Sequence, residues 1–172
     1  TLRNLKISDN FGSIVAGTVG VLAELAANYL LDNVEIRNVE TAAKFSTPGK
    51  TCWSWMLHHV TIADCVRGLD CSNSTASATP LTMFNVDIRR CTEWGAKFDK
   101  FTCLGWYGGT VADNQVGVIV HGDTNGQAAI AFHDLQWETN LTYDLDVGGA
   151  GTFPGGPVVV IAFSQDDMGE YF

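Results

Sequence analysis

Three acidic residues of this 172-residue chain stand at intervals that suit paired-carboxylate chemistry: Glu35, Asp87 and Asp134. The chain repeats about every 25 residues, so Glu35 and Asp87 are two repeats apart, and Asp87 and Asp134 stand in the same relation. On stacked strands spaced about 4.8 Å apart, such pairs lie about 9.5 Å apart. Carboxyl groups about 6.5–9.5 Å apart leave room for the water used by an inverting glycosidase. The spacing therefore indicates a candidate acid and base for glycoside cleavage. A charged ladder that is either solvated or part of a subunit interface is the alternative.

Five further residues are candidates for binding a substrate. Arg37 and Arg89 follow two residues after Glu35 and Asp87, and a guanidinium group can bind the carboxylate of an acidic sugar through two hydrogen bonds. Trp94, Tyr107 and Trp137 fall outside the positions expected to be buried, so we expect them to be exposed or to lie in turns. Exposed aromatic rings suit either the apolar faces of sugars or a subunit contact.

Other kinds of active site are not indicated by the sequence. The five cysteines form no Cys-x-x-Cys pair and no Cys/His spacing typical of zinc, so we expect no metal and no cofactor. We interpret the cysteines as free and mostly buried, with a Cys65–Cys91 bridge as the alternative. His58, His59, His121 and His133 do not pair with a serine or cysteine at the spacing of a known nucleophile. A hydrolase triad is therefore disfavoured.

The elements that must position these residues follow from the repeat. Overlaying the repeats aligns Ile36, Ile62, Ile88, Val111 and Leu135, at spacings of 26, 26, 23 and 24 residues. Within each unit apolar and polar residues alternate with period two, which is typical of strands with one buried face. A unit of about 25 residues with three short strands describes one coil of a parallel β-helix. A leucine-rich repeat would need an asparagine-containing frame that is absent, and propeller blades are longer.

The coils fill most of the chain. The overlay predicts an all-β fold, a parallel β-helix of about six to seven coils with three faces, in which the five aligned residues form one interior ladder. We assign residues 1–147 to the coils, and residues 148–172 to a glycine-rich hinge with one or more terminal strands. The apolar run 157–161 is either a last coil or a departing strand. Because the first residues already fit a coil and leave a strand edge uncovered, we expect the chain to be a piece of a longer polypeptide.

Composition limits the partners of this domain. The net charge is −9 and the sequence pI is near 4.6, which disfavours binding to the phosphate backbone of a nucleic acid. No run of 18 apolar residues occurs, so no membrane insertion is expected. The composition is compatible with a neutral, zwitterionic or basic partner, and neutral glycans belong to this group.

The stretches Val60–Cys71 and Val111–Val120 resemble the coil signature of pectate-lyase-like right-handed β-helices. Among these the chain is most similar to bacteriophage tailspike and tail-fibre proteins. The resemblance covers about residues 1–145 and is architectural, since the catalytic blocks of the polygalacturonases are missing. It implies a right-handed coil, a homotrimer assembled in the host cytoplasm, a place in the virion tail, and a bacterial surface polysaccharide as partner. Two functions stay open: a polysaccharide depolymerase (hydrolase or lyase), or a non-catalytic spacer or receptor-binding fibre.

Overall fold

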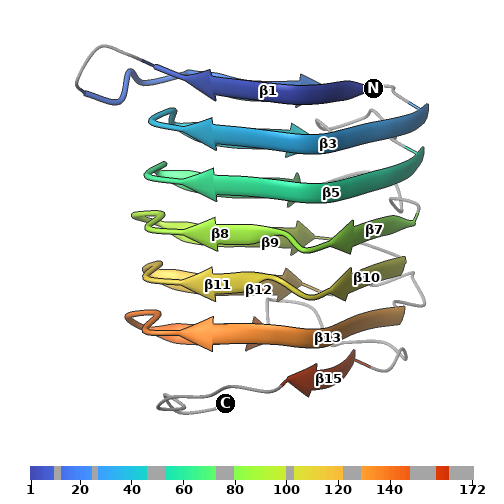
Figure 1. Ribbon diagram of the computed structural model, residues 1–172. Helices are drawn as coiled ribbons and strands as arrows, with labels where there is room; N and C mark the ends of the chain where they lie inside the picture. The colour runs from blue at the N-terminus through green and yellow to red at the C-terminus, as the bar shows by residue number, and fades with distance from the viewer. Residues whose placement is uncertain are drawn as a thin grey trace.

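The computed structural model describes residues 1–9, 13–24, 27–45, 53–72, 80–99, 103–121, 129–147 and 158–162. Within these ranges the chain forms strands and turns, with no helix and therefore no helix that could span a membrane. Every strand pairing is parallel. The prediction of an all-β parallel solenoid is confirmed (Figure 1).

The strands form two sheets that face each other. The nine-stranded sheet, called the long sheet below, contains β1 (Leu2–Ser8), β3 (Ala27–Arg37), β5 (Trp53–Ala63), β7 (Leu81–Phe84), β8 (Asp87–Arg89), β10 (Cys103–Tyr107), β11 (Thr110–Ala112), β13 (Ala129–Glu138) and β15 (Val158–Ala162). The six-stranded sheet contains β2 (Val19–Ala23), β4 (Thr41–Phe45), β6 (Arg67–Ser72), β9 (Trp94–Asp99), β12 (Val116–His121) and β14 (Tyr143–Val147).

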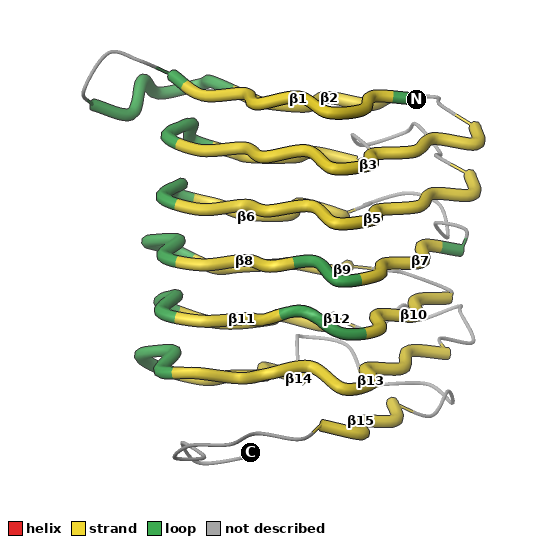
Figure 2. The backbone as a smooth tube through the Cα atoms, in the orientation of Figure 1, coloured by secondary structure: helices red, strands yellow, loops and turns green. Residues whose placement is uncertain are grey.

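Each level from β1 to β13 contributes to both sheets. In Figures 1 and 2 the chain crosses the near side in the long sheet, returns behind in the six-stranded sheet, and then descends one level, which makes the coil right-handed. The apolar run near residue 160 continues this stack, because β15 pairs in parallel with β13. The glycine-rich segment 148–157 lies outside the described residues.

The backbone of each level changes direction at residues with positive φ, and these residues form two columns along the long sheet. One column bends the long sheet and the other ends it, and the strand registers place their members one above another. Asn, Asp and His tolerate left-handed backbone better than most residues, so their recurrence suits these corners. The bend column contains Asn4, Asn33, His59, Asn85, Gly108 and Asp134, and the end column contains Asn38, Asp64, Arg90, Asp113 and Thr139.

The interior ladder differs from the predicted one in its last member. Ile36, Ile62, Ile88 and Val111 are fully buried and stacked in register, but Trp137 continues this ladder, whereas Leu135 lies two residues earlier. Leu135 is nevertheless fully buried. A slip of two residues keeps the same side chains facing inward, so the alternation of apolar and polar residues could not reveal it.

The cysteines that the structure describes are unbridged. Cys65, Cys71, Cys91 and Cys103 are all free thiols, and the first three are buried. The interpretation of these four as free is confirmed, while Cys52 lies outside the described residues. Burial raises the pKa of both the Cys65 and the Cys91 thiol, so these groups behave as small apolar side chains.

Candidate functional site

A polar groove of about 340 Å³ crosses the outer face of the long sheet at its bend. Two columns of side chains supply its polar groups, because the registers of β1, β3 and β5 set equivalent residues side by side. Asn33 Nδ2 donates a hydrogen bond to Asn4 Oδ1 over 2.8 Å. The groove therefore presents amides, an imidazole, a hydroxyl and both charges within three levels. Its polar lining consists of Asn4, Lys6, Asn33, Glu35, His59 and Thr61.

A column of stacked rings, called the aromatic column, lies along the same face of the long sheet. It consists of Phe84, Tyr107 and His133, which are register equivalents on β7, β10 and β13. The ring centroids of Phe84 and Tyr107 are 5.3 Å apart with an interplanar angle of 20°, and those of Tyr107 and His133 are 5.0 Å apart at 3°. Because the rings cover one another's faces, they offer a ligand mainly their edges.

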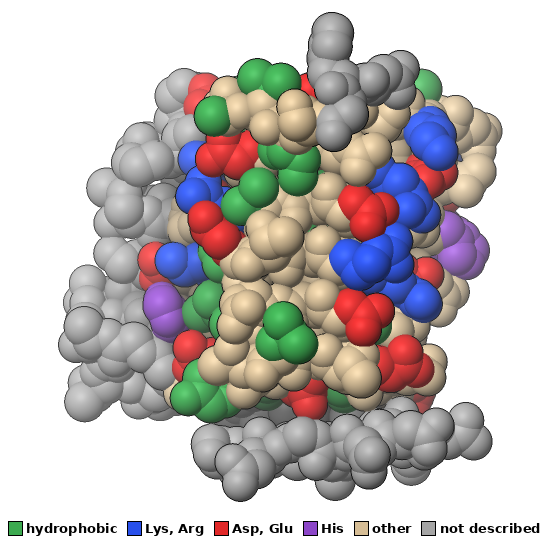
Figure 3. Space-filling model, turned by 90° about the vertical axis from the view of Figure 1, so that its left-hand side faces the viewer, with side chains coloured by type: hydrophobic (Ala, Val, Ile, Leu, Met, Phe, Trp, Pro, Cys, Tyr) green, Lys and Arg blue, Asp and Glu red, His purple; other side chains and the backbone are tan. Residues whose placement is uncertain are grey.

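Ion pairs connect the levels along the edge of the groove that Lys6 and Glu35 form. Glu35 pairs with Lys6 over 3.3 Å and with Arg37 within its own strand. Arg37 also donates to Asp64 over 2.8 Å, and Arg90 donates to the same carboxylate over 2.6 Å. We call Lys6, Glu35, Arg37, Asp64 and Arg90 the ion-pair ladder. Figure 3 shows acidic and basic side chains gathered in such a vertical row.

The ion-pair ladder determines the protonation state of Glu35, one of the predicted catalytic residues. The hydrogen bond from Arg37 holds the pKa of this carboxyl group below its usual range, and Lys6 acts in the same direction. A general acid of a glycosidase needs a raised pKa, so that it carries a proton at neutral pH. Glu35 in this arrangement is an ionised partner of two cations and is unsuited to protonating a leaving group.

The three predicted catalytic residues do not lie in one column. Glu35 and Asp87 do share a column, with Thr61 between them on β5. Asp134 was placed there wrongly: it belongs to the bend column, and Gln136 is the register equivalent of Thr110 and hence of Asp87. The cause is the two-residue slip that also displaced Leu135. The candidate pair of Asp87 and Asp134 is therefore not formed as predicted.

The predicted binding residues lie in different parts of the molecule. Arg37 is engaged by Glu35 and Asp64, whereas Arg89 lies 4.0 Å from Asp87 with its side chain 40% exposed. Tyr107 is exposed, as predicted, and belongs to the aromatic column. Trp94 is half-buried and lies on β9 of the six-stranded sheet, so it is remote from the groove in the fold. The prediction for Trp137 was wrong, because its indole is buried at 3% exposure in the interior ladder.

Sequence reasoning missed the side chains at the start of the aromatic column. Asp32 is the register equivalent of His58, which in turn precedes Phe84. His58 Nδ1 lies 2.9 Å from Asp32 Oδ1, and the adjacent His59 lines the groove. The signal was present in the sequence, because Asp32 and His58 are 26 residues apart, which equals the spacing between successive repeats there.

Acidification should reveal the contribution of Asp64 to stability. The hydrogen bond from Arg90, reinforced by Arg37, holds the pKa of Asp64 below its usual range in the folded protein. The stabilisation is therefore present above the pKa of the unfolded chain and is lost as the pH falls through the folded pKa. We expect the wild type to lose about 0.2–1 kcal/mol more stability than Asp64→Asn between pH 5 and pH 2, since solvent screens such exposed pairs. Urea unfolding at both pH values measures this difference, and equal losses would contradict it.

Comparison of the chain with protein-family models, with curated proteins and with solved structures found no match.

Proposed function

We propose that this chain recognises a bacterial surface polysaccharide in the groove at the bend of the long sheet. The groove itself is the observation that carries the proposal. Sugar hydroxyl groups both donate and accept hydrogen bonds, and the groove offers the amides of Asn4 and Asn33, the hydroxyl of Thr61 and the imidazole of His59. The groove extends over three stacked levels, which suits an extended ligand such as a polymer.

The proposed role is binding without cleavage, in a receptor-binding β-helix. Glu35 is held ionised by Arg37 and Lys6, and Asp134 stands outside the column of Asp87. Glu35 and Asp87 still share a column, but Glu35 is engaged by two cations and is unsuited to act as the acid of that pair. On the architectural resemblance noted above, we place this segment in a homotrimeric fibre of a phage tail. The acidic net charge of −9 fits a neutral or cationic glycan better than a polyanionic one.

Removing hydrogen-bonding groups from the groove should weaken glycan binding. Asn33→Gly keeps the left-handed backbone of this position, where φ is 54°, and Thr61→Val keeps the shape of the side chain. Each lost hydrogen bond contributes about 0.5–1.5 kcal/mol, so we expect the double variant to bind about tenfold more weakly. Titration calorimetry against a panel of capsular and lipopolysaccharide glycans identifies the ligand and measures this change.

Lys44→Ala is the matched control, because Lys44 lies on β4 of the six-stranded sheet, away from the groove. We expect it to bind the glycan with parental affinity. An equal loss of affinity in both variants would place the binding surface elsewhere. Incubation with the bound glycan should produce no new reducing ends. Reducing ends that appear with the parent and disappear in Asp87→Asn would replace binding by cleavage as the function.

A further inference from the structure

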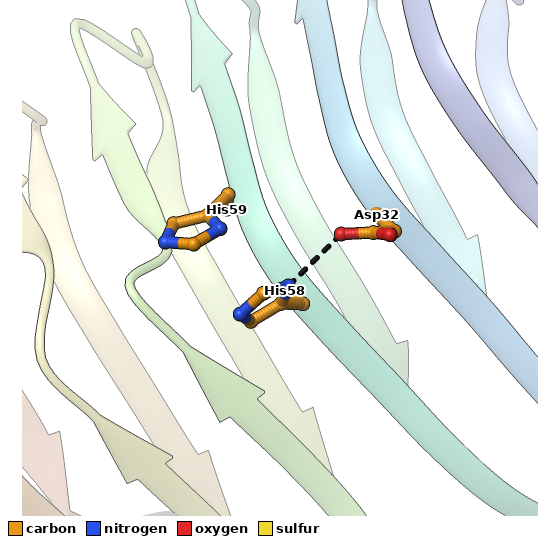
Figure 4. Close-up of side chains that lie close together, drawn as sticks. All are labelled: Asp32, His58 and His59. Carbon is orange, nitrogen blue, oxygen red and sulfur yellow. Dashed lines mark hydrogen bonds and ion pairs between the residues drawn. The ribbon is translucent and has the colours of Figure 1, made fainter.

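Two imidazoles and one carboxylate converge beside the groove. Asp32 on β3 and His58 and His59 on β5 each place one ligand atom within 4.8 Å of the ligand atoms of the other two. Figure 4 shows the His58 ring between the carboxylate of Asp32 and the ring of His59. The centroids of the two imidazole rings are 4.0 Å apart. Neither histidine is buried, so the cluster is open to solutes.

The fold brings these three side chains together by its bend and its register. Consecutive residues of a regular strand point to opposite faces, which would send one imidazole into the core. His59 instead has a φ of 51°, in the left-handed region, and this turn of the backbone leaves both imidazoles on the outer surface. The register between β3 and β5 then sets Asp32 beside His58 on the neighbouring strand. The cluster therefore rests on paired backbone rather than on a loop.

We infer that Asp32, His58 and His59 bind a late first-row divalent metal ion, of which Zn²⁺ is the representative. Imidazole nitrogens suit Zn²⁺, Cu²⁺ and Ni²⁺, whereas Ca²⁺ and Mg²⁺ prefer oxygen ligands alone. Metal–ligand bonds of about 2.0–2.2 Å require tetrahedral ligand atoms to lie about 3.3 Å apart. The three ligand atoms lie within 4.8 Å of one another, so a bound ion would draw them together by at most about 1.5 Å. Three protein ligands leave a further position for water or for a group of a bound molecule.

The surroundings of the cluster support its use as a site. Asn85 Nδ2 lies 3.2 Å from His59 Nε2, so the Asn85 amide can orient that ring and leave Nδ1 as the nitrogen available to a metal ion. Phe84 packs edge-on against His58 at a centroid distance of 6.4 Å and limits its rotation. Arg3 lies 3.2 Å from Asp32 and competes with a cation for the carboxylate, but its side chain is 60% exposed and can turn into solvent.

Titration of Zn²⁺ by calorimetry tests the inference. The experiment uses the full chain in a background with Cys52→Ser and Cys103→Ser, so that these thiols cannot capture the metal. We expect one Zn²⁺ per chain, and at least a tenfold loss of affinity in each of Asp32→Asn, His58→Gln and His59→Gln. The control is His133→Gln, which changes the imidazole at the other end of the aromatic column and should leave the affinity unchanged. Affinity that is equal in all four variants and the parent would overturn the assignment.

A spectroscopic measurement separates ligation from a merely structural effect of these substitutions. Co²⁺ in place of Zn²⁺ should give visible absorption bands without a thiolate charge-transfer band, and His58→Gln and His59→Gln should each lose the visible bands. Unchanged circular dichroism in the metal-free variants would show that the fold is intact. Persistence of the Co²⁺ spectrum in the His58→Gln/His59→Gln double variant would also overturn the site. The inference is independent of glycan binding, since Asn33→Gly/Thr61→Val should bind Zn²⁺ like the parent.

Discussion

Trp106→Ala is expected to lower the free energy of unfolding by about 3–5 kcal/mol, the range for removing a large aromatic side chain from a core. Trp106 is fully buried on β10 and stacks in register between Met83 and Phe132, which are also fully buried. Its ring lies 6.2 Å from that of Phe132. The levels above and below are fixed by backbone pairing, so the stack cannot collapse into the vacated volume. Urea unfolding followed by circular dichroism measures the loss.

Trp106→Phe is the matched control and should cost much less. The indole Nε1 of Trp106 is buried without a hydrogen-bond partner among the described residues, which is unfavourable for a polar group. Phenylalanine removes this unpaired donor and retains an aromatic ring, so the lost volume is partly offset. We expect a loss below about 2 kcal/mol. Equal losses for the alanine and phenylalanine variants would show that the indole volume is not what stabilises this level.

The architecture could be predicted from the sequence because burial in a parallel stack follows a strict alternation. Ile36, Ile62 and Ile88 recur 26 residues apart and do stack in register. The same alternation cannot fix the register to better than two residues, since a slip of two leaves the inward set inward. That ambiguity misplaced Asp134, whose true equivalents on the two preceding levels are Gly108 and Asn85.

The candidate site was less predictable, because it depends on the sign of φ at the corners. The alternation treats His58 and His59 as opposite-facing, but the left-handed conformation of His59 leaves both on the outer surface. The frequent Asn and Asp of the bend column mark this corner in the sequence, and aligning them would have corrected the register. The prediction for Trp137 was wrong for a related reason. Its strand was overlaid two residues out of place, which assigned this buried indole to a position outside the buried column.

A second large effect is expected in a column of small residues that runs through the six-stranded sheet. Gly20, Ala42, Gly68, Gly95 and Gly117 occupy one column through this sheet. A Cβ atom added to Gly68 would lie 1.9 Å from the carbonyl oxygen of Gly95, on the neighbouring strand. Since that oxygen belongs to the backbone of a paired strand, no side-chain rotation can relieve the clash. Either β6 or β9 must shift, which breaks the parallel pairing that holds both levels.

Gly68→Ala should therefore destabilise the protein by more than about 3 kcal/mol, at or beyond the upper end of the range for overpacked cores. The control is Ala42→Gly in the same column, which removes a methyl group and adds backbone freedom, and should cost only about 0.5–1 kcal/mol. Urea unfolding of both variants measures the difference, and loss of soluble Gly68→Ala protein alone would be consistent with the larger effect. Alanine is otherwise a mild substitution. A Gly68→Ala protein as stable as the parent would therefore contradict the close approach of Gly68 to the carbonyl oxygen of Gly95.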